Sequence, residues 1–275
     1  MYPKNNGVCF VGTSGGIAYA RDSCVVNNKI YVVNSYRISI FDAENFAYIT
    51  SFGSQGSGDG QFYDVVSLCS DRQYIYVIDN NPRLQKFTLE GQFISKVGSL
   101  GSGDDQFNTT RSIRHHNGKL YLIDYQNNRV KIHLASDLSY VDSFAVTAPL
   151  GAFVDAQNNY LVVRTESGLY IYRLDDKSLV KQKAISWGFG CELVNDYLYI
   201  SDYYNHKIIK YDYPTLNQIV GSYEPGQGSE PGQLNRPYHL YYWIEKNLIL
   251  CGNQNSPCYI VGITPELEWK VFDLD

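Results

Sequence analysis

Short runs of alternating apolar and polar residues, separated by turn-forming residues, follow one another along most of the chain. Within residues 64–97 this alternation predicts four strands, at 64–69, 74–79, 83–88 and 92–97. Tyr, Phe, Val and Ile are abundant, whereas segments rich in Ala, Leu, Glu and Lys are nearly absent. The pattern therefore predicts an all-β protein.

The strand pattern repeats along the chain. Segments 30–41, 75–87, 120–132 and 198–211 each consist of an alternating strand, an Asp or Asn, a short polar turn and a second alternating strand, and 160–172 and 248–261 are weaker copies. The first aligned positions are Tyr31, Tyr76, Tyr121, Tyr160, Tyr199 and Leu248, at spacings of 45, 45, 39, 39 and 49 residues. One structural unit of about 40–50 residues is thus repeated six times.

A second marker keeps the same register. The segments GSGDGQF, GSGDDQF and GSEPGQL end at Phe62, Phe107 and Leu234, each 14 residues before its aligned position. Four antiparallel strands alone would expose an apolar face and two edges, so the sheets must stack on one another. We expect a single domain over residues 1–275, a six-bladed β-propeller of four-stranded antiparallel blades. The alternative, a two-sheet sandwich, has no reason to keep a fixed repeat. The expected blades are 17–53, 62–98, 107–145, 149–187, 188–223 and 235–273.

These residues resemble the NHL repeat, in which a GxGxGQF segment precedes the pattern Y-V-x-D-x-x-N-x-R-I-x-x-F. The second copy matches at Gly58-Asp59-Gly60-Gln61-Phe62, Tyr76, Asp79, Asn81, Arg83 and Phe87. The third matches at Gly103, Gln106, Phe107, Tyr121, Asp124, Asn127 and Arg129, and the fifth at Tyr199, Asp202, Asn205 and Lys207. Copies four and six depart from the pattern, with Arg164 and Gly252 in place of the Asp. The resemblance implies an NHL-like propeller, an interaction domain that usually accompanies a RING finger and a coiled coil. Neither occurs here, so we expect an isolated domain or a stand-alone propeller without ligase activity.

Two terminal segments compete for the outer edge of the last blade. Residues 267–272 supply a fourth strand to the last repeat, while residues 7–16 resemble the end of a fourth strand. Propellers often close by lending a terminal strand to the opposite end of the chain. The sequence leaves open which of the two segments closes the ring.

Composition limits the classes of partner. The net charge of −5 argues against wholesale attraction to nucleic acid or anionic lipid, and no apolar run approaches the ~18 residues of a membrane span. The opening residues do not have the shape of a signal peptide. The six cysteines are dispersed, form no CxxC pair and lie in apolar surroundings, which predicts buried thiols and a cytoplasmic protein. They are Cys9, Cys24, Cys69, Cys191, Cys251 and Cys258.

One face of the propeller is the candidate binding surface. Strand alternation places the turn between the second and third strands of each blade beside the loop that arrives from the preceding blade. Tyrosines and amides are concentrated there, and this mixture suits polar recognition, although Asn also favours turns through its own backbone bonding. The residues are Tyr36, Asn80, Asn81, Tyr125, Gln126, Asn127, Tyr203, Tyr204, Asn205, His206, Asn253 and Asn255.

Acid–base pairs recur beside these turns, at Asp79/Arg83, Asp124/Arg129 and Asp202/Lys207. Repetition in register favours a scaffold role, in which the pair ties the turn through charge-assisted hydrogen bonds. The basic members still lie at the candidate surface. The complete candidate partner-binding set is Tyr36, Asn81, Arg83, Tyr125, Asn127, Arg129, Tyr203, Tyr204, Asn205 and Lys207.

Loop lengths predict where a partner sits. The two 39-residue spacings place short connections before copies four and five, whereas copy six is preceded by the long SYEPGQGSEPGQL segment. We therefore expect an uneven face with a low saddle over the fourth and fifth blades.

Catalysis is not expected, and neither is a cofactor or a resident metal. Some six-bladed propellers, among them lactonases and an amidating lyase, use metal ions in the central channel, and such sites need several converging imidazoles or oxygens. If the protein were such a metal-dependent hydrolase or lyase, the inner-strand candidates would be His115, His116 and His239. Asp22, Asp71 and Asp155 are expected near the turn after the first strand, in a turn role.

The sequence favours a non-catalytic interaction scaffold that binds a protein or peptide over the saddle. Single-stranded RNA is the alternative partner, because aromatic and Arg side chains on one face can read unstacked bases. The acidic balance and the dispersed turn residues Arg37, Arg83, Arg129 and Lys207 count against RNA.

Overall fold

The computed structural model describes residues 7–10, 20–217, 219–223, 227, 234–253 and 260–263. After β1 (Gly7–Phe10), its strands come in five groups of four along the chain, followed by a last group of three. The first two groups are β2 (Ala20–Val26), β3 (Lys29–Asn34), β4 (Arg37–Asp42), β5 (Tyr48–Phe52), and β6 (Val65–Ser70), β7 (Tyr74–Asp79), β8 (Arg83–Thr88), β9 (Phe93–Val97). The next two are β10 (Thr110–His116), β11 (Lys119–Asp124), β12 (Arg129–Leu134), β13 (Tyr140–Ala145), and β14 (Pro149–Asp155), β15 (Tyr160–Thr165), β16 (Gly168–Arg173), β17 (Leu179–Lys183). The last are β18 (Cys191–Val194), β19 (Tyr197–Asp202), β20 (Lys207–Asp212), β21 (Ile219–Tyr223), and β22 (Pro237–Trp243), the 3₁₀ turn η1 (Ile244–Lys246), β23 (Leu248–Asn253), β24 (Ile260–Ile263).

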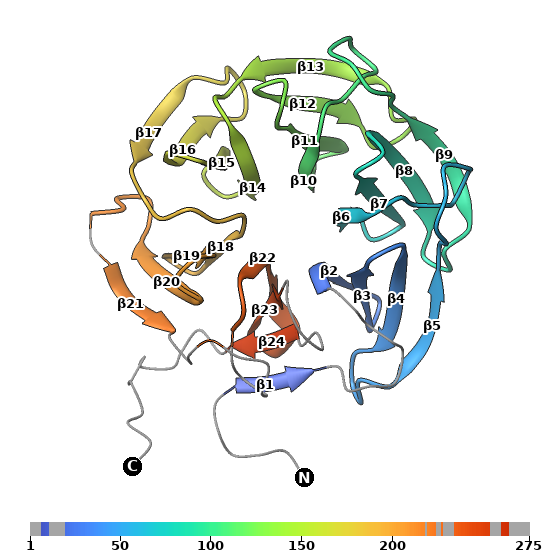
Figure 1. The fold of residues 1–275 in the computed structure, drawn as a ribbon. Helices are drawn as coiled ribbons and strands as arrows, with labels where there is room; N and C mark the ends of the chain where they lie inside the picture. The colour runs from blue at the N-terminus through green and yellow to red at the C-terminus, as the bar shows by residue number, and fades with distance from the viewer. Residues whose placement is uncertain are drawn as a thin grey trace.

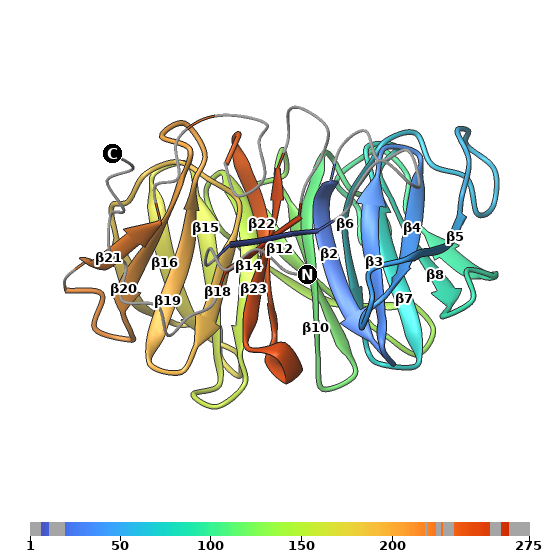
Figure 2. The same ribbon diagram turned by 90° about the horizontal axis from the view of Figure 1, so that it is seen from below.

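The sheets form the ring of a β-propeller (Figure 1), and every strand pair is antiparallel. The innermost strands β2, β6, β10, β14, β18 and β22 surround the centre. Seen from the side, these strands run from one face of the ring to the other (Figure 2). The fold class expected from the alternation is confirmed, and the strands of the second repeat begin and end within one residue of their predicted bounds.

The number of hydrogen-bonded sheets differs from the expected six. Four sheets have four strands each, and the fifth has eight, so the described strands form five sheets. The eight-stranded sheet arises because Ala20 on β2 pairs with Asn253 on β23, which joins the first strand group to the last. A single residue pair makes this junction, so the expectation of six separate sheets is wrong for this reason.

The outer edge of the last group is taken by the start of the chain. Strand β1 (Gly7–Phe10) pairs antiparallel with β24, with Gly7 opposite Ile263 and Phe10 opposite Ile260. The competing segment 267–272 lies outside the described residues, as do residues 11–16 of the N-terminal candidate. A strand contributed from one end of the chain thus joins the sheet formed by the other end.

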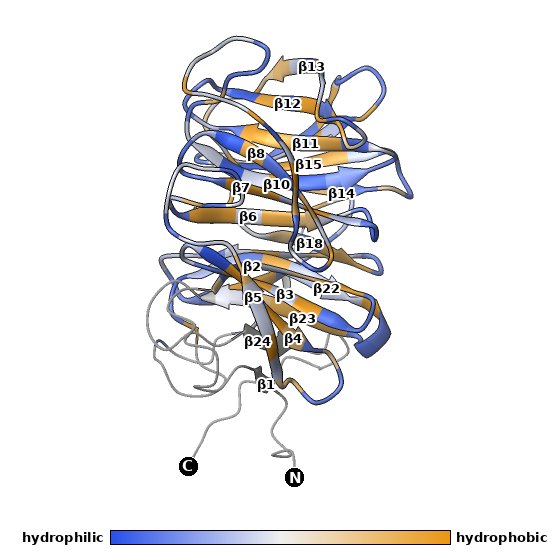
Figure 3. Cartoon of the chain, turned by 90° about the vertical axis from the view of Figure 1, so that its right-hand side faces the viewer, coloured by the Kyte–Doolittle hydropathy of each residue, from blue (hydrophilic) through white to orange (hydrophobic). Residues whose placement is uncertain are grey.

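Apolar side chains fill the spaces between neighbouring sheets. Figure 3 shows hydrophobic colouring along the strands and hydrophilic colouring at the turns of both faces. The repeated tyrosines link neighbouring sheets: the hydroxyl of Tyr31 donates to the carbonyl of Leu89 at 3.0 Å, and that of Tyr76 to Ala135 at 2.9 Å. Both tyrosines are fully buried, so their recurrence in the sequence reflects packing between sheets. Cys24, Cys69, Cys191 and Cys251 are buried free thiols, as expected.

No helix of the described residues is both long and apolar enough to span a bilayer.

Candidate functional site

The turns between second and third strands and the loops between sheets lie on one face, which we call the loop face. Backbone hydrogen bonds join the two kinds of segment: Asn80 N–H donates to Asp64 O, Tyr125 N–H to Thr109 O, and Tyr203 N–H to Trp187 O. The opposite face, here the hairpin face, carries the turns between first and second strands. The predicted gathering of turns and loops on one face is confirmed.

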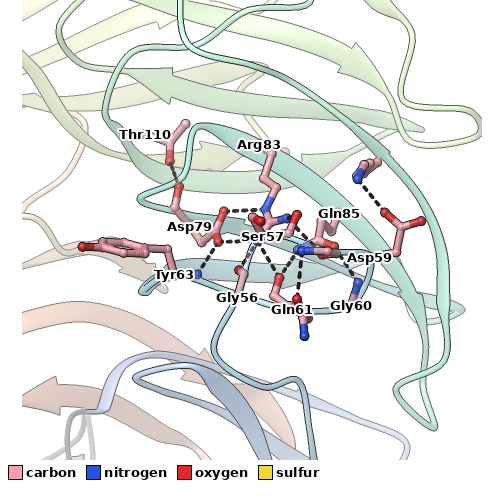
Figure 4. Close-up of polar contacts among 12 residues, drawn as sticks. Gly56, Ser57, Asp59, Gly60, Gln61, Tyr63, Asp79, Arg83, Gln85 and Thr110 are labelled. Atoms are coloured by element: carbon pink, nitrogen blue, oxygen red, sulfur yellow. Dashed lines mark hydrogen bonds and ion pairs between the residues drawn. The ribbon is translucent and has the colours of Figure 1, made fainter.

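Arg83 holds the glycine-rich loop that precedes its own sheet (Figure 4). Its guanidinium forms an ion pair with Asp79 at 3.1 Å and donates to the carbonyls of Ser57 at 2.7 Å and Gln61 at 2.7 Å. Further bonds reach the carbonyls of Gly56 and Gly58, and only 4% of the Arg83 surface is exposed. All these contacts are within the scaffold, so Arg83 has little surface left for a partner.

The third repeat uses the same device. Arg129 pairs with Asp124 at 2.7 Å and donates to the carbonyls of the loop at Ser102, 2.8 Å away, and Gln106, 3.1 Å away. Asn127 donates to Asp124 and to the carbonyl of Gly101, both at 2.8 Å. The glycine-rich segments are therefore clamped by protein groups.

The other candidates take different positions. Asn205 donates to both oxygens of Asp202, at 3.0 and 2.9 Å, and Lys207, on the same turn, is half-buried. Tyr36, which is 39% exposed, lies on the turn between β3 and β4, and Asn81 lies on the turn between β7 and β8. In the part of the chain that the structure describes, neither forms a ring contact or a hydrogen bond with Tyr125, Tyr203 or Tyr204. Asn253 is described only in its backbone, and Asn255 lies outside the described residues.

Tyr203 and Tyr204 belong to an aromatic cluster at the loop-face end of β14, β18 and β22. The Trp187 ring lies 5.0 Å from Tyr203 and 5.2 Å from Tyr204, and Phe189 stacks on Tyr238 at 3.9 Å. Tyr125 packs against the same group. We call Tyr125, Trp187, Phe189, Tyr203, Tyr204 and Tyr238 the aromatic cluster. Phe189, Tyr203 and Tyr238 are buried, whereas Tyr204 is 63% exposed and Trp187 and Tyr125 are half-buried.

Two arginines lie over these rings. The guanidinium carbon of Arg111 is 4.9 Å from the Tyr125 ring centroid and 5.9 Å from that of Phe189, and Arg236 is 5.4 Å from Tyr203. Such distances allow cation–π attraction. The Tyr125 hydroxyl donates to Glu166 at 2.5 Å, and this bond raises the pKa of Tyr125. The cluster thus combines exposed ring surface with positive charge.

The strand register places Thr165 and Asn253 at the position of the repeat Asp, since each ends the second strand of its repeat as Asp79 does, so the expectation that Arg164 and Gly252 replace that Asp is wrong. Arg164, one residue before Thr165, holds the segment that carries Trp187 and Phe189. It is fully buried and donates to the carbonyls of Ser186 at 2.7 Å and Gly190 at 3.0 Å. Burial lowers the pKa of Arg164 to about 10. A buried arginine of the fourth repeat therefore positions two rings of the cluster.

Short connections lie next to the cluster. Residues 146–148 link β13 to β14 and residues 184–190 link β17 to β18, whereas 53–64 and 98–109 precede β6 and β10. The repeat spacings in the sequence predicted these short connections but did not indicate that Trp187 and Phe189 in the second of them belong to the candidate site. Two aromatic residues separated by glycine in the segment WGFG were the available signal for Trp187 and Phe189.

The histidines proposed for a channel metal do not converge. His239 Nε2 bonds to the main-chain oxygen of Arg111 at 3.1 Å, whereas His115 stacks on Tyr76 near the hairpin face. The register of the strand pairs places His115 three residues closer to the hairpin face than His239, which is a separation of about 10 Å along the channel. His116 is half-buried at the end of β10, and the described residues contain no group of three His, Cys, Asp or Glu able to hold a metal ion.

Asp22 does not lie at a turn, contrary to expectation. It is the third residue of β2, buried in the channel, where it accepts a hydrogen bond from Ser67 Oγ at 2.5 Å. Asp71 and Asp155 do take turn roles, since they accept from the backbone N–H groups of Gln73 and Asn158. The spacing in the sequence separates these cases, because Asp22 lies nine residues before Tyr31, whereas Asp71 and Asp155 each lie five residues before the aligned Tyr76 and Tyr160.

No family model matches the sequence, and no curated protein matches it.

Proposed function

We propose that this protein is a non-catalytic binding module, an NHL-like β-propeller, which recognises a peptide segment of a protein partner through the aromatic cluster. The observation that carries the proposal is the exposed Tyr204 ring against Trp187, beside the exposed Arg236. Tyr, Trp and Arg are the side chains that most often dominate binding energy at protein interfaces. Elsewhere on the loop face, Arg83 and Arg129 are occupied with their own loops.

The chemistry of the cluster points to a particular kind of peptide. Rigid rings lose little conformational entropy on binding and offer apolar surface, while Arg111 and Arg236 favour a carboxylate. The exposed Glu166 carboxylate accepts from the Tyr125 hydroxyl, and the two guanidiniums of Arg111 and Arg236 outnumber it beside the rings. The expected ligand is a peptide with an apolar or aromatic residue next to an acidic one.

Single-stranded RNA is the competing ligand, because rings and guanidiniums also stack on bases. The net charge of −5 weighs against it, since RNA binding depends on neutralising phosphates. Salt dependence distinguishes the two ligands.

The test is selection of peptides from a random phage-displayed library on the purified protein, followed by affinity measurement on synthetic peptides. Trp187→Ala and Tyr204→Ser should each weaken binding at least tenfold, a loss typical of hot-spot residues. Tyr63→Ser is the matched control, since Tyr63 is 62% exposed on the same face but outside the cluster. Selected peptides should carry acidic and apolar residues.

Three results would contradict the proposal. One is equal loss of affinity in the Tyr63 control, and another is the absence of any selected peptide. The third is tighter, steeply salt-dependent binding of a uridine oligonucleotide, which would assign the face to RNA.

A further inference from the structure

A cavity of about 550 Å³ occupies the hairpin-face end of the central channel. Its walls extend from the hairpin turns at Asn27, Asn28 and Glu245 to the middle of the innermost strands, as far as Arg114 and Glu192. Pockets that hold small organic ligands have volumes of roughly 300–1,000 Å³. The cavity is therefore large enough for such a ligand, and it lies at the other end of the channel from the aromatic cluster.

Six residues at one depth of the channel line this cavity, one from each innermost strand. They are Cys24, Cys69, Arg114, Phe153, Glu192 and Tyr241, which pair with Tyr31, Tyr76, Tyr121, Val162, Tyr199 and Leu250. On the second strands, Tyr occupies four of these six paired positions, whereas the six residues on the innermost strands that line the cavity are mostly of different types. A residue needed by the scaffold recurs in every repeat, so the variation at this depth indicates a specific site.

The charges near the cavity are unevenly matched. Arg114 Nη1 lies 3.3 Å from Asp22 Oδ2 and donates to the carbonyl of Ile113 at 2.8 Å. Asp22 and Arg114 thus neutralise each other. The wall of the cavity holds the acidic residues Glu192 and Glu245 and the basic residues Arg72, Arg114 and Lys246, of which Arg72, Glu245 and Lys246 are exposed at the hairpin face. Glu192 forms no ion pair with any described residue.

The environment of Glu192 keeps its carboxyl protonated near neutral pH. Burial raises the pKa of Glu192 to about 8, against the lowering effects of Arg114 on β10 and of the Tyr242 N–H, while Asp22 on β2 raises it further. Tyr241 and the Cys191 thiol are the other titratable groups that interact with it. A cation brought next to the carboxyl would favour its ionised form.

Aromatic side chains form part of the same wall. Phe153, Tyr241 and Trp243 line the cavity, and the protein's own Lys246 Nζ lies 5.8 Å from the Trp243 ring centroid at the mouth. Aromatic walls around a carboxyl are the chemistry that recognises organic ammonium groups.

We propose that this cavity binds a small organic monocation, an arylalkyl or alkyl amine, whose ammonium group pairs with Glu192 and whose apolar body packs against Phe153, Tyr241 and Trp243. The site is separate from the aromatic cluster, because buried residues fill the channel between them. Asp22, Ser67, Ser112 and His239 are each at most 2% exposed. The two proposals therefore stand or fall independently.

The first test compares three probes of one shape: 3-phenylpropylamine, 3-phenylpropanol and 3-phenylpropanoate. Calorimetry at pH 8.5 should detect saturable binding of the amine alone, with a dissociation constant of about 1 mM or below. Its affinity should fall about 20-fold between pH 8.5 and pH 6.5, because only the ionised fraction of Glu192 is competent. Titration at pH 7 in two buffers of different ionisation enthalpy should show release of nearly one proton per amine bound, a result that needs no variant.

The second test uses Glu192→Gln, which should weaken amine binding at least tenfold, with thermal unfolding as the check on folding. Glu245→Gln is the matched control, since Glu245 also lines the cavity but is exposed at its mouth, and it should bind the amine as the wild type does. Binding of the propanoate in preference to the amine, amine binding without proton release, or no binding of any probe at 10 mM would each overturn the proposal.

Discussion

His239 on β22 reaches across the central channel and donates from Nε2 to the main-chain oxygen of Arg111 on β10, at 3.1 Å. A carbonyl only accepts, so Nε2 carries the proton and Nδ1 is a bare acceptor. Nδ1 is buried without a protein partner in the described structure. Burial lowers the pKa of His239 to about 4, an effect that Asp22 opposes and Arg114 reinforces.

This contact predicts sensitivity to acid. The folded state keeps His239 neutral while the unfolded chain takes up a proton below about 6.5, so the stability contributed by neutral His239 is lost as pH falls from about 6.5 to about 4. The loss is at most about 1.4 kcal/mol per pH unit. His239→Gln should flatten the dependence of unfolding free energy on pH in this window, measured by urea denaturation. Parallel curves for wild type and variant would refute it.

Glu192 predicts the opposite dependence of stability on pH, with stability lost as pH rises. Its folded-state pKa is raised from 4.5 to about 8, so the contribution of the protonated carboxyl is complete below about 4.5 and is lost as pH rises to about 8. Glu192→Gln cannot ionise and should lose less stability than the wild type between pH 5 and pH 8. Thermal unfolding at several pH values measures this, and an unchanged slope would show that Glu192 titrates normally.

Arg83 should be far more important for stability than Arg37, although each begins the third strand of its strand group. Arg83 is buried and paired with Asp79, whereas Arg37 is exposed and its strand partner is Asn34. Arg83→Ala leaves a buried carboxylate uncompensated and should cost about 3–5 kcal/mol of unfolding free energy. Arg37→Ala should stay within about 0.5 kcal/mol. Similar losses of unfolding free energy in the two variants would contradict the role of Arg83 in holding its loop.

Gly151 should control the position of the aromatic cluster. A Cβ at Gly151 would lie 1.9 Å from the carbonyl oxygen of Phe189, so an added methyl must push the segment 187–190 away. Gly151→Ala should destabilise the protein by about 1–3 kcal/mol and change the fluorescence of Trp187. Gly118→Ala is the control: its Cβ meets nothing within 4 Å, although φ is +70°, and only a stability loss of about 1 kcal/mol is expected. Unchanged Trp fluorescence in the Gly151 variant would argue against the close contact.

Local pattern predicted much of the scaffold. Alternation located β6 to β9 to within one residue, and the constant offset from Phe62 to Tyr76 and from Phe107 to Tyr121 fixed the repeat. Phe62 and Phe107 are fully buried, and Arg83 and Arg129 tie their loops. These features are determined by neighbours along the chain, which is why a single sequence reveals them.

The sequence by itself determined an all-β chain of repeated four-stranded units, with turns and connecting loops gathered on one face. Tertiary structure alone decided that Ala20 pairs with Asn253, that Asp22 meets Arg114, and that His239 meets Arg111. Strand alternation depends on each residue and its immediate neighbours. The contacts within the channel depend on closure of the ring, which brings together residues about a hundred positions or more apart, and no local pattern records which of them will meet.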